Sequence, residues 1–209
     1  MRHSLHKSVI FAGPSGSGKT TIAQHLLKEN PELSFSISAC TRAKRPQEVH
    51  GKDYYFLSID EFKREITQKS FIEWEEVYDG HYYGTLKREV DSIWQSGKAA
   101  VFDMDVQGAL RLKSHFQERA LAVYIQVPSM QLLTERLKKR KTESEEGLGL
   151  RMGKAAYEAS LAEKFDTILV NEQLQETLET AQKLLDDFLS TPSVPKQDRL
   201  SGEIESRVN

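Results

Sequence analysis

Hydrophobic residues in this chain form short apolar runs, separated by longer segments in which they recur every three or four positions. Four runs, at 9–12, 99–102, 120–127 and 167–170, have the length of buried strands. The segments between them have the spacing of helices that bury one face. Strands covered on both faces that alternate with helices predict an α/β fold, with a central parallel sheet flanked by helices.

Local signals set the expected helix boundaries. The first predicted helix follows the first strand and stops near Asn30-Pro31, because proline disfavours helix in the residue before it. Asp60 and Thr85 are candidate N-caps of two further helices. The predicted helices cover residues 21–28, 60–68, 85–95, 107–115, 128–140, 154–164 and 173–189.

The middle of the chain has the pattern of exposed strands and loops. Residues 33–38 and 71–75 alternate apolar and polar side chains, which places Glu73 and Glu75 on one face of a strand. Asp79-Gly80 is a hairpin turn signal. A short aromatic strand is predicted at 54–57 and a polar loop at 41–52. We therefore expect a small, mainly β lobe at about 38–85.

The chain length of 209 residues allows one sizeable domain. We expect this domain at 1–189, with a core at about 1–37 and 86–189 into which the lobe is inserted. Residues 142–150 are acidic and contain glycine, which predicts a mobile segment. The tail at 190–209 has two prolines and many charges, and is predicted to be disordered.

Charge and cysteine content narrow the function classes. The 29 basic and 31 acidic residues give a formal net charge of −2, which disfavours nonspecific nucleic-acid binding. A single cysteine, Cys40, excludes an internal disulfide framework and suits a reducing compartment. No apolar stretch approaches the roughly 18 residues of a membrane helix, and the polar N-terminus does not have the pattern of a secretory signal. A cytoplasmic protein is expected, without nucleic-acid or membrane partners.

The most informative motif lies between the first strand and the first helix. Gly13-Pro14-Ser15-Gly16-Ser17-Gly18-Lys19-Thr20 matches the phosphate-binding loop pattern. Its glycines let the backbone approach a phosphate closely, with N–H groups directed at the anion. Lys19 supplies a charge for the β- and γ-phosphates, and the Thr20 hydroxyl can ligate Mg²⁺. A glycine-rich turn that matches by chance is the alternative.

A second acid supports a phosphoryl-transfer site. Asp103 follows the buried run 99–102, so it lies at the C-terminal end of a predicted strand, where α/β folds bind ligands. In P-loop proteins such an acid holds Mg²⁺ together with the loop threonine. The alternative is an ordinary aspartate that caps the next helix.

Further motifs follow in one order along the chain, and this order resembles guanylate kinase. The motifs lie at 38–48, 51–56, 71–74, 82–85, 103–108, Arg136, Arg140, 142–146, Arg151 and 169–171. The resemblance spans about residues 7–189. It implies a P-loop kinase fold with a GMP-binding lobe and a lid at about 141–153. It also implies an Mg²⁺-dependent enzyme of purine nucleotide metabolism that transfers the γ-phosphoryl group of ATP to GMP or dGMP.

The resemblance also implies a role for each matching residue. Those expected to bind GMP are Ser38, Arg42, Arg45, Glu48, Tyr54, Glu73, Tyr83, Thr85 and Asp105. Those expected to bind ATP are the loop residues 13–20 and Asn171, the last near the adenine. Thr20 and Asp103 are the expected Mg²⁺ ligands. The expected catalytic cations are Lys19, Arg42, Arg136, Arg140 and Arg151.

The proposed role of Glu73 agrees with the chemistry of the base. A carboxylate can accept hydrogen bonds from N1–H and N2–H of guanine, whereas adenine offers neither donor and would leave the carboxylate unpaired. Without the resemblance, Glu73 reads as an exposed strand acid like Glu75, and Arg42 and Arg45 read as solvated surface charges.

Some positions depart from the family pattern. Lys44 and Gln47 stand where the family usually has proline and glycine, and Gly147-Leu148-Gly149 replaces a more helical stretch of the lid. Two other functions stay open: a guanylate-kinase-like binding module without catalysis, and a kinase for another phosphorylated small molecule. The expected oligomeric state is a monomer or a homodimer.

Overall fold

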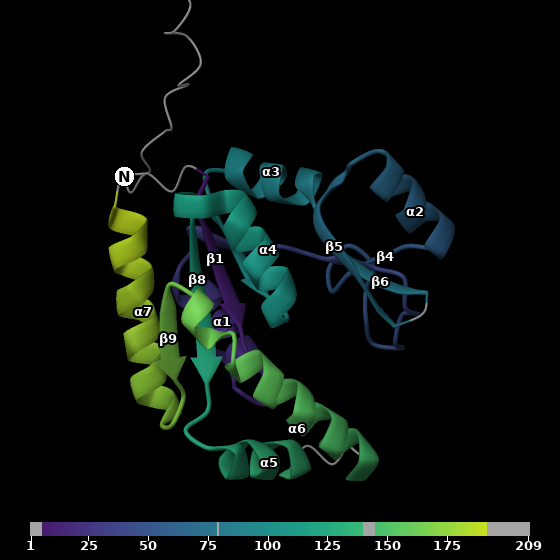
Figure 1. The fold of residues 1–209 in the computed structure, drawn as a ribbon. Coiled ribbons are helices and arrows are strands. Elements are labelled where there is room, and N and C mark those ends of the chain that lie inside the picture. The colour runs from purple at the N-terminus through teal and green to yellow at the C-terminus, as the bar shows by residue number, and fades with distance from the viewer. Residues whose placement is uncertain (1–5, 79, 140–144, 192–209) are drawn as a thin grey trace, which may run out of the picture.

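The central sheet of the computed structural model, which describes residues 6–78, 80–139 and 145–191, is built from five strands (Figure 1). Their order is β2-β7-β1-β8-β9, and every neighbouring pair is parallel. The strands are β1 (Ser8–Ala12), β2 (Leu33–Phe35), β7 (Ala99–Asp103), β8 (Ala120–Gln126) and β9 (Thr167–Val170). The predicted parallel α/β fold is therefore confirmed.

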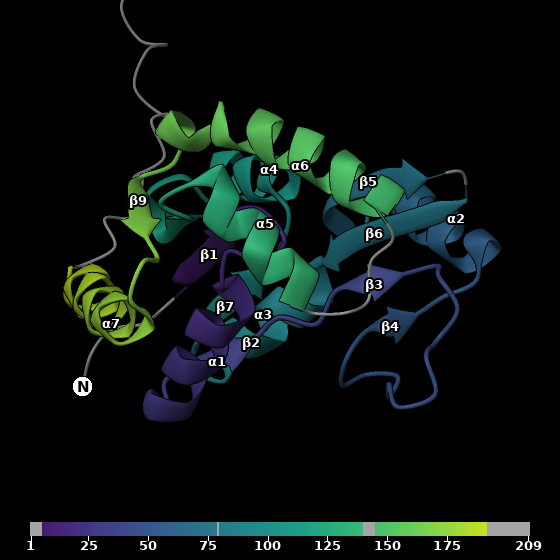
Figure 2. The same ribbon diagram turned by 90° about the horizontal axis from the view of Figure 1, so that it is seen from below.

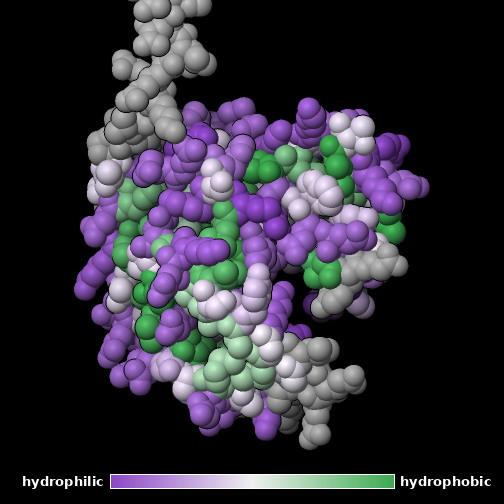
Figure 3. Space-filling model, viewed as in Figure 1, coloured by the Kyte–Doolittle hydropathy of each residue, from purple (hydrophilic) through white to green (hydrophobic). Residues whose placement is uncertain are grey.

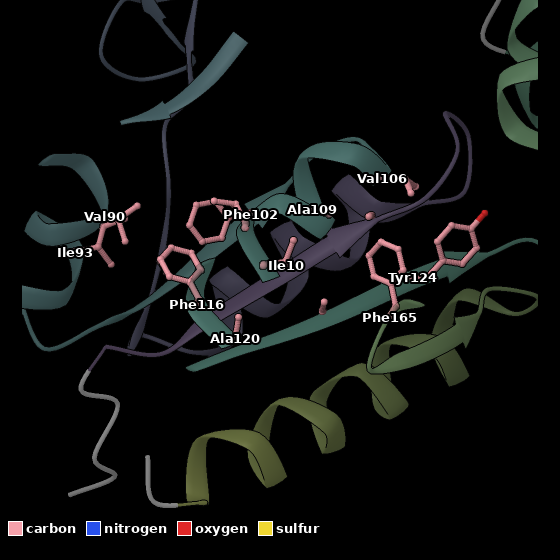
Figure 4. Packing of buried hydrophobic residues seen from close by; sticks show 14 of the residues in the cluster. Ile10, Val90, Ile93, Phe102, Val106, Ala109, Phe116, Ala120, Tyr124 and Phe165 are labelled. Atoms are coloured by element: carbon pink, nitrogen blue, oxygen red, sulfur yellow. The ribbon is translucent and has the colours of Figure 1, made fainter. Parts of the chain in front are cut away.

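Alternate residues of the same strands enter two separate cores, one on each face of the sheet. Ile10 and Tyr124 point to the face covered by α3 (Lys87–Gln95) and α4 (Val106–Phe116), where Figure 4 shows them with Phe116 and Phe165. The other face carries Val9 and Val123 and is covered by α1 (Lys19–Glu29) and α7 (Leu174–Ser190). Burial of both faces explains why these strands read as continuous apolar runs.

The second sheet lies to one side of the first and has its own small core (Figure 1). Its order is β4-β3-β6-β5, and only the β3–β4 pair is parallel. The strands are β3 (Ala39–Cys40), β4 (Tyr55–Phe56), β5 (Phe71–Tyr78) and β6 (His81–Leu86). The helix α2 (Ile59–Thr67) packs on them, with the Phe62 ring stacked on Phe71 at 4.4 Å between centroids. We call this sheet with α2 the lobe.

Two further helices complete the described chain. α5 (Met130–Lys139) packs against α6 (Glu145–Ala159) through Leu133, Leu137 and Ala155. In Figures 1 and 2, α6 extends away from the five-stranded sheet. Short 3₁₀ turns at Gln117–Arg119 and Ala162–Lys164 precede β8 and β9. Among the described residues, no helix has the length and apolar character needed to cross a membrane.

Several predicted boundaries were wrong. Only residues 33–35 of the strand predicted at 33–38 form a strand, β2, because the chain leaves the first sheet after Phe35, and the next strand, β3, begins at Ala39 in the second sheet. Thr85 does not cap a helix: it lies in β6, and α3 begins at Lys87. Ser58, not Asp60, caps α2, and it forms a capping box with Glu61.

The segment expected to be mobile also differs from the prediction. Residues 145–150 form the start of α6, so the helix predicted at 154–164 begins earlier, and it ends at Ala159. Residues 140–144, which include Arg140, and the tail from 192 lie outside the described residues.

Candidate active site

The phosphate-binding loop joins β1 to α1, as predicted, and its glycines adopt conformations that other residues disfavour. Gly13 has a φ of 140°, and a Cβ there would lie 2.4 Å from the carbonyl oxygen of Ile125. Gly18 has a φ of 99°, and a Cβ there would lie 2.3 Å from the amide nitrogen of Asn171. These contacts show that the loop is packed tightly against β8 and the end of β9, in a shape that requires glycine.

Asn171 supports the phosphate-binding loop through a buried hydrogen bond. Its side chain belongs to a residue only 4% exposed, and its Nδ2 donates a hydrogen bond to the carbonyl oxygen of Ser17 at 2.7 Å. Its Oδ1 accepts one from the Thr177 hydroxyl at 3.3 Å. Arg136 Nη2 donates to the carbonyl oxygen of Asn171 at 3.0 Å. The sequence suggested a place near the adenine, and the structure shows both side-chain polar atoms of Asn171 engaged by the protein.

A cleft of about 480 Å³ opens above the loop. Figure 3 shows the indentation between the lobe and the rest of the molecule, with hydrophilic side chains around it. The lining residues come from the loop, the end of β7, the lobe and α6: Gly13, Ser15, Gly16, Gly18, Lys19, Thr20, Thr21, Tyr54, Asp103, Met104, Asp105, Arg151, Lys154 and Glu158. Residues from distant parts of the sequence therefore share one hydrophilic cleft.

Thr20 and Asp103 meet in this cleft, as predicted. The Thr20 hydroxyl donates a hydrogen bond to the Asp103 carboxylate. The contact follows from topology, because β1 and β7 are parallel neighbours with Phe11 opposite Asp103. The α1 helix therefore starts beside the C-terminal end of β7. A hydroxyl and a carboxylate are hard oxygen donors of the kind that Mg²⁺ prefers.

One face of α6 contributes to the other wall of the cleft. Arg151 Nη1 donates to the Ser15 hydroxyl of the loop at 2.8 Å. Lys154 and Glu158 lie one and two turns further along, and their charged atoms are 3.8 Å apart. Burial raises the pKa of Glu158, opposed by the charges of Lys154 and Lys19. Lys154 and Glu158 are not among the residues predicted from the sequence, although their spacing from Arg151 places all three on one helical face.

In the lobe, Arg42 forms a partly buried ion pair with Glu48. Its Nη1 and Nη2 donate to the two carboxylate oxygens at 2.7 and 2.6 Å, and the side chains are 15% and 12% exposed. The hydrogen bonds from Arg42 lower the pKa of Glu48 to about 2. Glu48 also accepts a hydrogen bond from the backbone N–H of Arg45, whose side chain is exposed. One carboxylate therefore fixes the loop that carries both arginines.

Two tyrosines surround this ion pair. The Arg42 guanidinium carbon lies 4.8 Å from the ring centroid of Tyr54, and the rings of Tyr54 and Tyr83 meet edge to face at 6.3 Å. Burial raises the pKa of both phenols, opposed by the charge of Arg42. The structure thus brings together four of the residues expected to bind GMP: Arg42, Glu48, Tyr54 and Tyr83.

Glu73 is a buried carboxylate rather than an exposed strand acid. It is 8% exposed, and its Oε1 accepts a hydrogen bond from the Thr85 hydroxyl at 2.8 Å. Burial raises its pKa to about 7, although the Thr85 hydrogen bond and the charge of Arg111 act in the opposite direction. Arg111 Nε lies 3.6 Å from its Oε2. Arg111 is not among the residues predicted from the sequence, and it lies 38 positions further along the chain than Glu73.

Ser38 and Asp105 border the same region. The Ser38 carbonyl accepts a hydrogen bond from the backbone N–H of Tyr55, which ties the lobe strands together. Asp105 caps α4 by accepting from the backbone N–H of Gly108 at 2.9 Å, and it also lines the cleft. The charge of Asp105 raises the pKa of Glu73, so the two acids lie within electrostatic reach of each other.

Comparison with known proteins is consistent with this geometry. Residues 5–188 match the family model described as guanylate kinase. The guanylate kinase of Bacteroides fragilis is 44% identical over 183 residues, which is 88% of this chain and 90% of the relative. That of Porphyromonas gingivalis is 44% identical over 187 residues, 89% of this chain and 100% of the relative.

A solved structure agrees. The crystal structure of guanylate kinase from Anaplasma phagocytophilum has a TM-score of 0.70 at 29% sequence identity, and the match covers 90% of this chain and 88% of that one. The family model and the curated relatives each cover most of the chain, and together they establish that this chain belongs to the guanylate kinase family.

Proposed function

We propose that this chain transfers the γ-phosphoryl group of ATP to GMP, giving ADP and GDP, in the cleft between the phosphate-binding loop and the lobe. The observation that carries the proposal is the composition of that cleft. Lys19 and the Thr20–Asp103 pair lie on one side of it, and Tyr54, which contacts Arg42, lies on the other. A donor nucleotide and an acceptor phosphate can therefore meet there.

On the donor side, the loop backbone and its cations position the phosphates. Successive N–H groups at the start of α1 form an anion site, and the helix dipole adds to it. Lys19 and Arg151 place positive charge at this loop, and we assign Arg136 and Arg140 to the same set of cations. Phosphoryl transfer needs little covalent chemistry from the protein, so positioning and charge stabilisation are the main contributions of these residues.

Thr20 and Asp103 would hold Mg²⁺. Their oxygen atoms fit the ion, and they meet in the cleft where the donor phosphates are expected. Among the described residues, no group of three or more His, Cys, Asp or Glu side chains forms a metal site. Mg²⁺ is typically bound by one or two carboxylates together with substrate phosphates, and the Thr20–Asp103 pair supplies one carboxylate and one hydroxyl. The ion, when bound, neutralises charge on the transferred phosphoryl group.

On the acceptor side, Arg42 is already positioned for a phosphate. A carboxylate presents two oxygens to a guanidinium in the same fork geometry as a phosphate does, and Glu48 takes that position in this structure. Arg45, Tyr54 and Tyr83 complete the proposed phosphate site. Glu48 holds the loop in place, and the phosphate of GMP either shares Arg42 with Glu48 or displaces Glu48 from it.

Base selection falls to Glu73 in this proposal, with Ser38, Thr85 and Asp105 around it. As an ionised carboxylate, Glu73 can accept hydrogen bonds from both N1–H and N2–H of guanine. Sites that hydrogen-bond a substrate in this way reject analogues that lack the donor by roughly 10⁴–10⁵-fold. Thr85 already orients one carboxylate oxygen, and because each carboxylate oxygen has two lone pairs, both oxygens keep acceptor capacity for the base.

The free cysteine of this chain fits a reducing compartment. Cys40 is a buried free thiol, and such thiols persist in the cytoplasm. We propose a cytoplasmic enzyme that acts as a monomer or a homodimer. Closure of the lobe and of α6 over the cleft is expected to exclude water from the reaction.

The test is an assay of ADP release with ATP, Mg²⁺ and each of GMP, AMP, CMP and UMP in turn. Turnover with GMP alone supports both the reaction and the base site. Equal turnover with AMP would contradict base selection by Glu73. Binding of GMP without any turnover would contradict the kinase activity and favour a binding module.

A further inference from the structure

Arg111 joins the lobe to the body of the molecule at the base site. It lies in α4, which starts directly after the strand that carries Asp103, and α4 packs against β5. Glu73 and Glu75 are on β5 and, being two residues apart, share a face of the strand. The guanidinium contacts both acids: Nη2 donates to Glu75 Oε2, and Nε lies 3.6 Å from Glu73 Oε2.

The two acids differ in exposure, so they use the cation differently. The Glu75 side chain is 35% exposed and can be solvated, whereas that of Glu73 is 6% exposed and has lost most of its water. A carboxylate removed from water stays ionised only if charges or hydrogen bonds replace that hydration. Thr85 supplies one hydrogen bond to Glu73, and Arg111 supplies the positive charge.

Other groups near Glu73 oppose its ionisation. The negative charges of Asp105, at the start of α4, and of Glu75, on the same strand, both raise its pKa, as burial does. Arg111 and the Thr85 hydroxyl act in the other direction. Arg111 is therefore the cation that counters these effects.

We propose that Arg111 is a positioning residue that determines specificity: it keeps Glu73 ionised and oriented toward the guanine base, while Glu75 anchors the guanidinium. This inference rests on the proposed base-reading role of Glu73. A protonated Glu73 would carry a hydrogen on one oxygen and could no longer accept from both N1–H and N2–H. The charge of Arg111 thus acts on GMP through Glu73, without a contact to the nucleotide.

Removal of Arg111 is compatible with folding. Its side chain is 40% exposed and opens onto a groove of about 460 Å³ that is also lined by Ile66, Phe71 and Trp74. Truncation there leaves no closed cavity, so the fold loses little packing. The variant Arg111→Met keeps the aliphatic part of the side chain and removes the charge.

The experiment measures KM for GMP, KM for ATP and kcat between pH 5.5 and 8.5 (a range of about 3 pH units around neutrality) for wild type, Arg111→Met and Arg111→Lys. In wild type, KM for GMP should rise as the pH falls and Glu73 protonates. In Arg111→Met this rise should begin about one pH unit higher, which corresponds to about a tenfold higher KM at low pH. KM for ATP and kcat should not change, because only GMP binding is affected. Arg111→Lys keeps the positive charge, so its pH profile should lie close to that of wild type.

Two variants separate the possible failures. Arg88→Met removes a similar ion pair, to Glu65, between α3 and the lobe helix α2, without touching Glu73, and it should retain the wild-type pH profile. Glu73→Gln should raise KM for GMP, and adding Arg111→Met to it should cause no further rise.

Each outcome has one meaning. If Glu73→Gln leaves KM for GMP unchanged, the base-reading role of Glu73 is wrong, and the inference fails with it. If Glu73→Gln raises this KM but Arg111→Met has the wild-type profile, only the Arg111 inference is wrong. The same holds if Arg88→Met shifts the profile as much as Arg111→Met does. Should Arg111→Met fail to fold, Arg111→Gln gives the same comparison.

Discussion

The phosphate-binding loop and the lobe hold their expected ligands in different ways. The loop is one continuous segment, and its shape is fixed by glycine conformations and by the buried Asn171 amide. The lobe site is assembled from side chains of several strands and loops, and its charged groups are held by one another, as in the Arg42–Glu48 and Arg111–Glu75 pairs. The donor site is therefore built mainly from backbone, and the acceptor site from ion pairs.

This difference has a physical consequence. Backbone N–H groups carry no net charge to desolvate, so an anion site made of them can stay open to water at little cost. Arginines and glutamates that have lost part of their hydration need partners before the substrate arrives. In the lobe these partners are other residues of the protein, so we expect part of the binding free energy of GMP to be used in displacing or sharing them.

The largest expected effect comes from Lys19, the mobile charge of the backbone-built site. The variant Lys19→Met should lower kcat by about 10³-fold, because a cation acting on the transferred phosphoryl group is lost. GMP binding should not change if the two sites are held independently. Kinetics with ATP and calorimetry with GMP alone test this. A parallel loss of GMP affinity would contradict the separation of the two sites.

A smaller effect is expected from the loop backbone itself. The variant Gly13→Ala should lower the free energy of unfolding by about 2–3 kcal/mol, because the added Cβ meets the Ile125 carbonyl in a strained conformation. Gly97→Ala is the matched control: its φ is also positive, at 76°, but its Cβ would meet nothing within 4 Å. It should cost about 1 kcal/mol. Denaturant unfolding of both variants measures the difference, and equal values would show that packing does not fix the loop.

The smallest effect is expected from the ion pair of the lobe. The pKa of Glu48 is lowered from 4.5 to about 2 in the folded protein, so its ionised form stabilises the fold above pH 4.5. This contribution should be lost as the pH falls toward 2. Glu48→Gln should therefore show a weaker decrease in stability over this range than wild type, measured by denaturant unfolding at each pH. Identical slopes would mean that the Arg42–Glu48 pair does not stabilise the lobe.

Sequence patterns located the donor site better than the acceptor site, because the donor site is one continuous segment and the acceptor site is assembled from separate segments. The loop residues are contiguous, and Asp103 follows an apolar run, so local patterns placed Thr20 and Asp103 at the ends of elements where P-loop proteins bring such residues together. The contact of Glu73 with Arg111 joins two elements far apart in the chain, and no local pattern predicts it. The family resemblance pointed to Glu73, but its burial and its partner came from the structure.

Errors in the predicted elements also have local causes. The apolar–polar alternation at 33–38 continues into the passage between the two sheets, so only its first half, 33–35, forms a strand. Thr85 has the residue type of a helix cap, but its hydroxyl bonds to Glu73 instead. Acidic residues and glycines at 145–150 suggested mobility, and the structure has them at the start of α6. Tertiary contacts outweighed local preference in each case.

The separate core of the lobe, in which Phe62 stacks on Phe71, determines which motions are open to it. The chain passes between the two sheets near residues 36–38 and again near 86–87. Two such crossings can serve as hinges, and the line through them is the expected axis of rotation of the lobe. Turning about this axis leaves the hydrogen-bond ladders of both sheets intact. The long side chains of Arg88 and Arg111, which pair with Glu65 and Glu75 of the lobe, can follow such a rotation, so we expect closure around the substrates to need torsion at only a few residues and no remodelling of either sheet.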